Sequence, residues 1–179
     1  MKKILIIIDM QNDFITGCLG NKECEAVVKN VVDVINNGDY SNVILTRDTH
    51  HDNYPDTQEG RKLPVPHCIE NTEGWEINKQ VMDAVNSKYN HKNILIIDKP
   101  SFGSLELATF LGGMKTYKDD EIDFVGVCTG ICVISNVLLA KAAVPETKIC
   151  VIEKACACVT PESHKTAIEA MKTCQVDII

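Results

Sequence analysis

The chain has 179 residues, 45% of them hydrophobic, which is enough for one well-buried domain and too little for two. We therefore expect a single domain over residues 1–179. Acidic residues outnumber basic residues by 25 to 18, and the formal net charge is -7. This balance excludes the basic stripe that binding to a nucleic-acid backbone requires, so nucleic acid is not an expected partner.

The sequence predicts neither a targeting segment nor a membrane span. The apolar run 4–8 ends at Asp9 without a small-residue cleavage site after it, and no later run approaches the roughly eighteen apolar residues of a membrane-spanning helix. The nine cysteines lack the CxxC spacing of zinc knuckles and redox dithiols, which favours free thiols in a reducing compartment. We expect a cytoplasmic protein with no membrane partner.

Apolar runs alternate regularly with amphipathic stretches along the chain. The runs predict strands, buried on both faces, at residues 4–8, 43–46, 94–97, 122–127 and 148–152, with a sixth candidate at 175–179. The amphipathic stretches predict helices at residues 24–36, 76–86, 105–111, 132–142 and 161–171. Asn37-Gly38 is a helix stop, and Thr160 followed by Pro161 is a helix start. This alternation is typical of a parallel, doubly wound α/β sheet with helices on both faces.

Polar side chains follow several of these strands. Asp9 comes after the first strand, Asp48 after the second and Lys99 after the third, while Cys132 lies just beyond the fourth. Because ligands bind at the carboxyl ends of the strands in an open parallel sheet, we expect these residues to gather along one edge of the sheet.

Cys132 is the candidate nucleophile. It lies in a strand, tight turn and helix arrangement, where unpaired backbone N–H groups favour a thiolate and can face an oxyanion. A carboxylate at Asp9 could accept the thiol proton and later deliver it to a leaving group. A cation at Lys99 would lower the thiol pKa from its free value of about 8.5. Taken singly, each residue has a structural alternative. Cys132 could be a small buried hydrophobic residue, Asp9 a turn cap and Lys99 a surface lysine.

A second group of residues has the chemistry of a metal site. Asp48 and His50 lie on the same side of an extended segment, and Glu59 and His67 follow in the long polar loop that we expect at residues 47–73. This mixed nitrogen and oxygen set suits Zn²⁺, Fe²⁺ or Mn²⁺. His51 and Asp52 are alternative ligands in the same loop.

Five motifs resemble the isochorismatase-like cysteine hydrolases, and among these the nicotinamidases (pyrazinamidases), in both order and spacing. They are ILIIIDMQNDF at residues 4–14, TRDTH at 46–50, PHCIENTEG at 66–74, DKPS at 98–101 and GVCTGICV at 126–133. The resemblance covers nearly the whole chain. It implies a Rossmann-like sheet of six parallel strands, as in the isochorismatase-like fold, and a homo-oligomer.

The resemblance also implies roles for particular residues. Asp9, Lys99 and Cys132 would form a catalytic triad, and one divalent metal ion, most often zinc, would be held by Asp48, His50, Glu59 and His67. A cis peptide bond would precede Cys128, and the backbone N–H groups of Cys128 and Cys132 would bind the oxyanion. Phe14 would pack on the substrate ring.

The activity implied is hydrolysis of nicotinamide to nicotinate and ammonia through a thioester on Cys132, in NAD salvage and pyridine nucleotide biosynthesis. One alternative is a related hydrolase that acts on another small amide, carbamate or ureide. A more distant alternative is a binding protein or thiol redox sensor in which Cys128 or Cys156 pairs with an exposed, low-pKa Cys132.

Two features depart from the nicotinamidase pattern. Gly130 stands where the family often has an acidic residue. Residues 63–66 hold no tryptophan before the His67-Cys68 pair, and Trp75 follows it instead. The second aromatic wall of the pocket therefore has no candidate.

Overall fold

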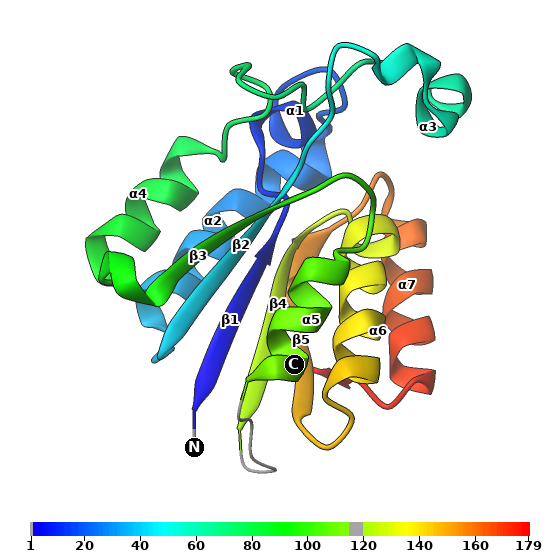
Figure 1. The fold of residues 1–179 in the computed structure, drawn as a ribbon. Coiled ribbons are helices and arrows are strands. Elements are labelled where there is room, and N and C mark those ends of the chain that lie inside the picture. The colour runs from blue at the N-terminus through cyan, green and yellow to red at the C-terminus, as the bar shows by residue number, and fades with distance from the viewer. Residues whose placement is uncertain (1, 115–119) are drawn as a thin grey trace.

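The computed structural model describes residues 2–114 and 120–179 and contains a sheet of six parallel strands (Figure 1). The strands are β1 (Lys3–Ile8), β2 (Asn42–Asp48), β3 (Ile94–Lys99), β4 (Glu121–Val127), β5 (Lys148–Ala157) and β6 (Asp177–Ile178). Their order in the sheet is β3-β2-β1-β4-β5-β6. Successive strands are added toward one edge of the sheet from β1 to β3 and toward the other edge from β4 to β6, so the switch point lies between β1 and β4.

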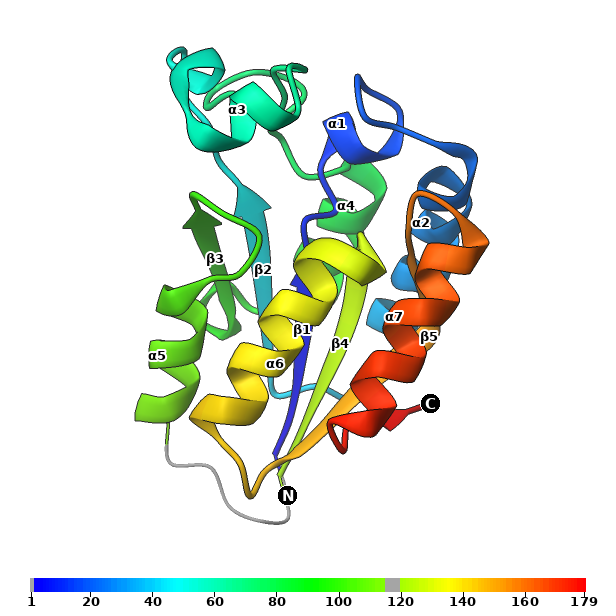
Figure 2. The same ribbon diagram turned by 90° about the vertical axis from the view of Figure 1, so that its right-hand side faces the viewer.

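Helices cover both faces of the sheet (Figure 2). On one face lie α2 (Lys22–Asn37) and α4 (Lys79–Lys88), and on the other lie α5 (Leu105–Gly113), α6 (Ile134–Ala143) and α7 (Pro161–Thr173). Successive side chains of β1 point to opposite faces, so Leu5 and Ile7 enter the core under α2, whereas Ile4 and Ile6 enter the core under α6. The expected doubly wound α/β fold is confirmed.

The edge strand β3 differs from its prediction. Its Ile96 is 37% exposed, so β3 is not buried on both faces as expected, because an edge strand has a neighbour on one side only. Strand β5 extends five residues past its predicted end at residue 152, although Glu153 and Lys154 interrupt the apolar pattern. The pairing of β5 with β4 resumes beyond them, matching Gly126 with Cys156.

The helix signals at Asn37-Gly38 and Thr160 are confirmed. Helix α2 ends at Asn37, and Thr160 forms a capping box with Ser163 at the start of α7. The helix predicted from residue 76 begins later, at Lys79, because the side chain of Asn78 accepts a hydrogen bond from the Gln80 N–H and caps it there.

Among the residues that the structure describes, four short helices have no counterpart in the prediction. They are α1 (Asn12–Ile15), α3 (Gln58–Lys62) and two 3-10 helices, Tyr54–Asp56 and His91–Asn93. The predicted loop 47–73 is therefore wrong in part, since it begins inside β2 and contains α3. Both α1 and α3 lie beyond the carboxyl ends of the strands (Figure 1). Within the described residues, no helix is long and apolar enough to cross a bilayer.

Candidate active site

The structure brings Asp9, Lys99 and Cys132 together beyond the carboxyl ends of β1, β3 and β4. Lys99 Nζ lies 2.7 Å from Asp9 Oδ2 and 3.6 Å from Cys132 Sγ. The Cys132 thiol also interacts with Asp9, whose charge raises the pKa of the thiol. All three side chains are buried, and Cys132 is only 4% exposed. A nucleophile, a base and a cation are thus in mutual contact.

The backbone and neighbouring side chains hold Asp9 in place. Asp9 has a φ of 48°, which turns the chain sharply at the end of β1. Thr46 Oγ1 donates a 2.6 Å hydrogen bond to Asp9 Oδ1. Gly126, with a φ of 122°, lets β4 pass close beneath, since a Cβ there would lie 2.1 Å from the carbonyl oxygen of Ile8.

Burial dominates the electrostatics of this triad. It raises the pKa of Cys132, and the charge of Asp9 raises it further, while Lys99 opposes both. The expected low thiol pKa is therefore wrong: Lys99 acts in the expected direction, but desolvation outweighs it. Burial also raises the pKa of Asp9 against the opposing charge of Lys99. Burial alone would lower the pKa of Lys99, but Asp9, Cys132 and Asp48 outweigh it and raise it.

These shifts fix the resting state of the triad. Cys132 keeps its proton and Lys99 is charged, and the charge of Lys99 favours the carboxylate form of Asp9 against the effect of burial. The raised pKa of Cys132 also disfavours the redox-sensor alternative, which requires a low-pKa thiolate at this position.

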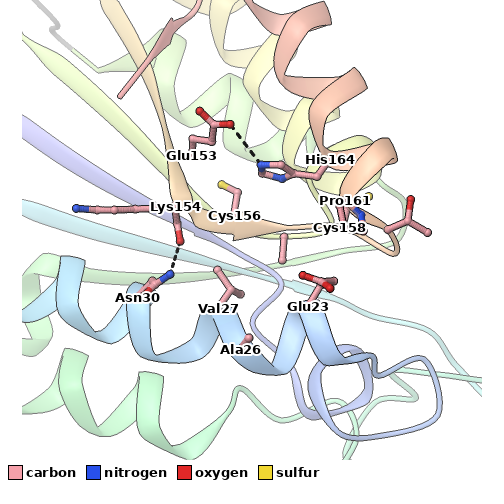
Figure 3. Close-up of a pocket in the computed structure, with 12 residues that line it drawn as sticks. Glu23, Ala26, Val27, Asn30, Glu153, Lys154, Cys156, Cys158, Pro161 and His164 are labelled. Atoms are coloured by element: carbon pink, nitrogen blue, oxygen red, sulfur yellow. Dashed lines mark hydrogen bonds and ion pairs between the residues drawn. The ribbon is translucent and has the colours of Figure 1, made fainter.

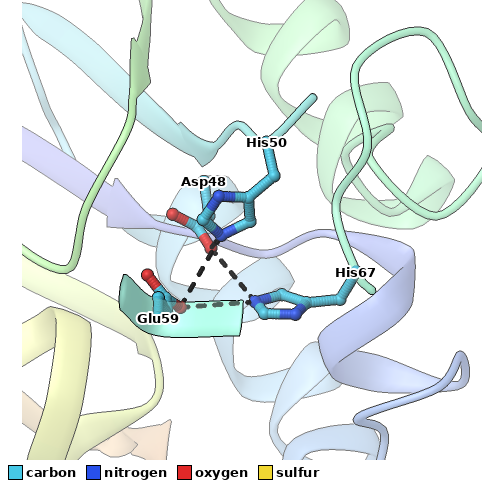
Figure 4. Close-up of side chains that lie close together, drawn as sticks. All are labelled: Asp48, His50, Glu59 and His67. Carbon is cyan, nitrogen blue, oxygen red and sulfur yellow. Dashed lines mark ion pairs between the residues drawn. The ribbon is translucent and has the colours of Figure 1, made fainter. Parts of the chain in front are cut away.

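The four predicted metal ligands also come together, and their side chains point toward one another (Figure 4). Asp48 Oδ2 lies 3.1 Å from His50 Nε2 and 3.5 Å from His67 Nε2. Glu59 Oε1 lies 3.7 Å from His50 Nε2 and 3.8 Å from His67 Nε2. One ligand atom from each residue lies within 4.8 Å of every other. The set is a possible metal-binding group.

An unsatisfied atom tests whether a metal ion fits this group. His50 Nε2 is buried and makes no hydrogen bond to any described residue. His67 Nδ1 lies 2.8 Å from the carbonyl oxygen of Val65, so the ring can donate there and present Nε2 to a metal. Two imidazole nitrogens and two carboxylates are a donor set that divalent transition metals accept, so the residues fit a metal ion.

The charge distribution supports this arrangement. Burial would raise the pKa of Asp48, but the neighbouring rings of His50 and His67 and the charge of Lys99 hold it below its usual range. Lys99 Nζ lies 3.2 Å from Asp48 Oδ1, so Asp48 belongs to both clusters. The alternative ligand His51 points away, with a 67% exposed side chain that faces Glu70.

Two residues near this group were not predicted from the sequence. Gln11 donates to the carbonyl oxygen of Asp48 at 2.8 Å and accepts from its N–H at 2.7 Å, which fixes the ligand backbone. The ring of Tyr54 packs against those of His50 and His67, with centroid distances of 4.7 and 5.1 Å. Gln11 could have been predicted as a site residue, because it is a polar residue two positions after Asp9, at the end of a strand. No sequence pattern indicated that Tyr54 lies at the site.

A cavity of about 350 Å³ reaches Cys132 of the triad and three residues of the metal group. Phe14, the predicted substrate-binding residue, lies on its wall with its ring centroid 5.6 Å from that of His67. Phe102 also lines the cavity and supplies a second aromatic side chain. Trp75 packs instead against the guanidinium of Arg47, 3.6 Å from its ring. The remaining lining residues are Leu19, Asp48, Glu59, Leu63, His67, Cys128, Ile131, Cys132 and Val159.

The turn that carries Cys132 begins with an unusual peptide bond. The bond between Val127 and Cys128 is cis, as the family resemblance implied. A π-helical turn, Thr129–Val133, follows and leads into α6, which therefore begins two residues later than predicted, at Ile134. Cys128 and Cys132 both reach the cavity from this turn.

The fold and the grouped residues define a parallel α/β protein with a cysteine, aspartate and lysine cluster beside a possible metal site. Residues 3–179 match the Isochorismatase domain family, and the chain belongs to that family. It is 28% identical to the nicotinamidase of Saccharomyces cerevisiae, over 77% of this chain and 81% of the relative.

Solved structures agree with this assignment. The chain matches a nicotinamidase/pyrazinamidase of Bacillus subtilis with a TM-score of 0.80 and 28% identity, over 99% of each chain. It matches the pyrazinamidase of Pyrococcus horikoshii in complex with zinc with a TM-score of 0.75 and 25% identity, over 100% of this chain and 99% of that one. The expected family and the expected class of nicotinamidase-like hydrolases are confirmed.

Proposed function

We propose that the protein is a metal-containing cysteine amidohydrolase that converts nicotinamide to nicotinate and ammonia. The observation that carries this proposal is the single cavity of about 350 Å³ that reaches both Cys132 and the Asp48–Glu59–His67 side of the metal group. A small ring carboxamide can place its amide at the thiol and its ring beside the metal group. Relatives named nicotinamidase support the choice of substrate.

The walls of the cavity suit a flat, largely apolar ring. Phe14 and Phe102 offer aromatic faces, and Leu63, Ile131 and Val159 add aliphatic surface. Burying such a ring contributes about 25 cal/mol per Å² of apolar area removed from water. The polar groups that reach the cavity belong to the metal group and to the triad, so they would orient the ring.

In the first half of the proposed reaction, Asp9 accepts the thiol proton as the Cys132 sulfur attacks the carboxamide carbon. The backbone N–H groups of Cys128 and Cys132 stabilise the oxyanion of the tetrahedral intermediate. Asp9 then returns the proton to the nitrogen, the C–N bond breaks, and ammonia leaves a thioester on Cys132.

In the second half, Asp9 takes a proton from a water molecule that attacks the thioester carbon. The C–S bond breaks, the proton returns to the sulfur, and nicotinate leaves. Lys99 stays charged throughout, because it stabilises the carboxylate form of Asp9 and the thiolate form of Cys132. The pKa of Asp9, raised by burial, makes it a stronger base than a solvated aspartate.

Asp48, His50, Glu59 and His67 would hold the metal ion, which we take to be zinc, with iron or manganese as alternatives. When bound, such an ion supplies a Lewis-acid position that a ring nitrogen can occupy. On this proposal the protein works in the cytoplasm, in NAD salvage, as a homo-oligomer.

Ammonia release from nicotinamide by the purified protein tests the proposal. It is run beside the Cys132→Ala variant and beside a chelator-treated sample whose metal content is measured. We expect the wild type to release ammonia, and we expect this release to be lost in the Cys132→Ala variant and in the chelator-treated sample. Equal release without Cys132 would refute the nucleophile, and no release from metal-loaded wild type would point to another small amide, carbamate or ureide as the substrate.

A further inference from the structure

Three cysteines outside the triad lie in contact beside the catalytic turn. The thiol of Cys128 interacts electrostatically with the thiols of both Cys158 and Cys24. Cys24 belongs to the first turn of α2, whereas Cys128 and Cys158 directly follow β4 and β5. The proposed reaction uses only the backbone of Cys128 and neither of the other two thiols.

The register of the sheet places Cys128 and Cys158 opposite each other. Gly126 pairs with Cys156 and Val127 pairs with Ala157, so Cys128 and Cys158 are the first residues after the last paired residues of the two neighbouring strands. Adjacent strands lie about 4.8 Å apart. That spacing falls within the range of about 4.4 to 6.8 Å that disulfides require between Cα atoms.

A surface cleft gives small molecules access to Cys158, although only 3% of this residue is exposed. The cleft has a volume of about 310 Å³ and lies between α2 and the start of α7 (Figure 3). Cys158 belongs to its lining, together with Glu23, Val27 and His164. Cys24 is fully buried and is not among the residues that line the cleft. Of the two partners of Cys128, Cys158 is therefore the one that a solute reaches.

The surroundings of Cys158 favour its thiolate. The neighbouring Cys128 thiol lowers the pKa of Cys158 to about 5 against the opposing effect of burial, and Ser163 lowers it further. The N–H of Gly130 also donates to Cys158 Sγ at 3.4 Å. By contrast, burial raises the pKa of the neighbouring Cys156 to about 12. A thiolate attacks oxidants far faster than a thiol does.

We propose that Cys128 and Cys158 form a peroxide-sensitive dithiol that closes to a disulfide next to the active site. The Cys158 sulfur attacks one oxygen of a hydroperoxide, the O–O bond breaks, and a sulfenic acid and a water or alcohol result. The Cys128 sulfur then attacks the sulfenic sulfur, the S–O bond breaks, and the departing hydroxide takes the Cys128 proton as water. Both thiols are oxidised, the peroxide is reduced, and a thiol reductant reverses the change.

The disulfide acts on the cavity through Cys128. This residue lines the cavity, and forming the bond draws it toward Cys158 and away from its resting position. The effect on turnover rests on the proposed function, in which the Cys128 N–H binds the oxyanion. Losing one such donor lowers kcat by on the order of 10²-fold. Formation of the bond itself does not depend on that function.

The test is peptide mapping after treatment of the purified protein with hydrogen peroxide. Trypsin places Cys128 in the peptide 119–141 and Cys158 in the peptide 155–165, whereas Cys24 lies in the peptide 23–29. We expect the first two peptides to be linked, with the loss of two hydrogen atoms. Fragmentation must then assign the bond to Cys128 and Cys158 rather than to Cys132 or Cys156, which share those peptides.

Matched variants separate the two partners of Cys128. Cys24→Ser should still form the link, whereas Cys158→Ser should not, and its activity should no longer be lost and recovered with peroxide and reductant. A link from Cys128 to Cys24, or oxidation of Cys132 alone, would overturn the proposal, as would unlinked peptides. Mapping of the wild type decides the matter even where Cys158→Ser fails to fold, and it needs no substrate.

Discussion

Lys99 Nζ lies 2.7 Å from Asp9 Oδ2, and neither side chain is exposed to solvent. Removing one partner of such a pair leaves a buried charge without compensation. We therefore predict that Lys99→Met lowers the free energy of unfolding by about 3 to 5 kcal/mol. Urea unfolding followed by circular dichroism measures this change.

The double variant Asp9→Asn/Lys99→Met is the control for that experiment. It removes both charges, so it should regain most of the stability that Lys99→Met loses. If the double variant loses as much free energy of unfolding as Asp9→Asn and Lys99→Met lose together, the two residues are not coupled. The ion pair would then not explain the instability of Lys99→Met.

Asp9→Asn tests the proposed base. It should reduce kcat for amide hydrolysis by about 10² to 10⁴-fold, which is the usual contribution of a general acid-base group. Its circular dichroism spectrum should match that of the wild type. Turnover within a few fold of the wild type would assign proton transfer to another group.

The pH dependence of alkylation tests the charge of Asp9 separately. Burial and the Asp9 carboxylate both raise the pKa of Cys132, so Cys132 should react with iodoacetamide only at alkaline pH. Asp9→Asn removes one of these causes and should move the midpoint of Cys132 labelling to lower pH. Mass spectrometry of the Cys132 peptide reports the labelling, and an unchanged midpoint would contradict the stated electrostatics.

The metal group gives a prediction with an internal control. His67→Ala removes a ligand from the group and should weaken metal binding at least about 10-fold. Mutating a residue that only hydrogen-bonds to a metal ligand already costs about this much affinity. His51→Ala changes the same loop at an exposed side chain outside the group and should bind metal as the wild type does. Elemental analysis after dialysis compares the two, and equal metal loss in both would remove the group as the binding site.

Glu121, at the amino end of β4, makes stability depend on pH. Burial alone would raise its pKa, but hydrogen bonds from Lys148 and Lys3 outweigh it and lower the pKa to about 2. A folded-state pKa below the unfolded value stabilises the fold at neutral pH, and this contribution is lost as pH falls toward 2. Glu121→Gln should therefore be less stable than the wild type at pH 7, and urea unfolding should show the two converging in acid. A constant difference would exclude this ion-pair origin.

The sequence predicts the sheet and the triad well because both follow from position along the chain. Asp9 and Lys99 stand at the ends of apolar runs, and the carboxyl ends of parallel strands share one edge. The pKa of Cys132 could not be predicted in this way, since burial depends on packing that periodicity does not reveal. The role of Phe102 in lining the cavity was not predicted for the same reason. Phe102 lies only three residues after Lys99 in the sequence, but whether it lines the cavity depends on the path of the loop that carries it.

The assembly of the site from Asp9, Asp48, Lys99 and Cys132 has a consequence for folding. Each residue ends or follows a different parallel strand, and parallel strands meet only after a helical crossover has been closed. Such distant contacts form slowly compared with local helices. The Cys132 thiol therefore contacts Asp9 and Lys99 only when the sheet is nearly complete. During refolding, enzymatic activity should return after helical structure does. A chain truncated before β4 should have no activity.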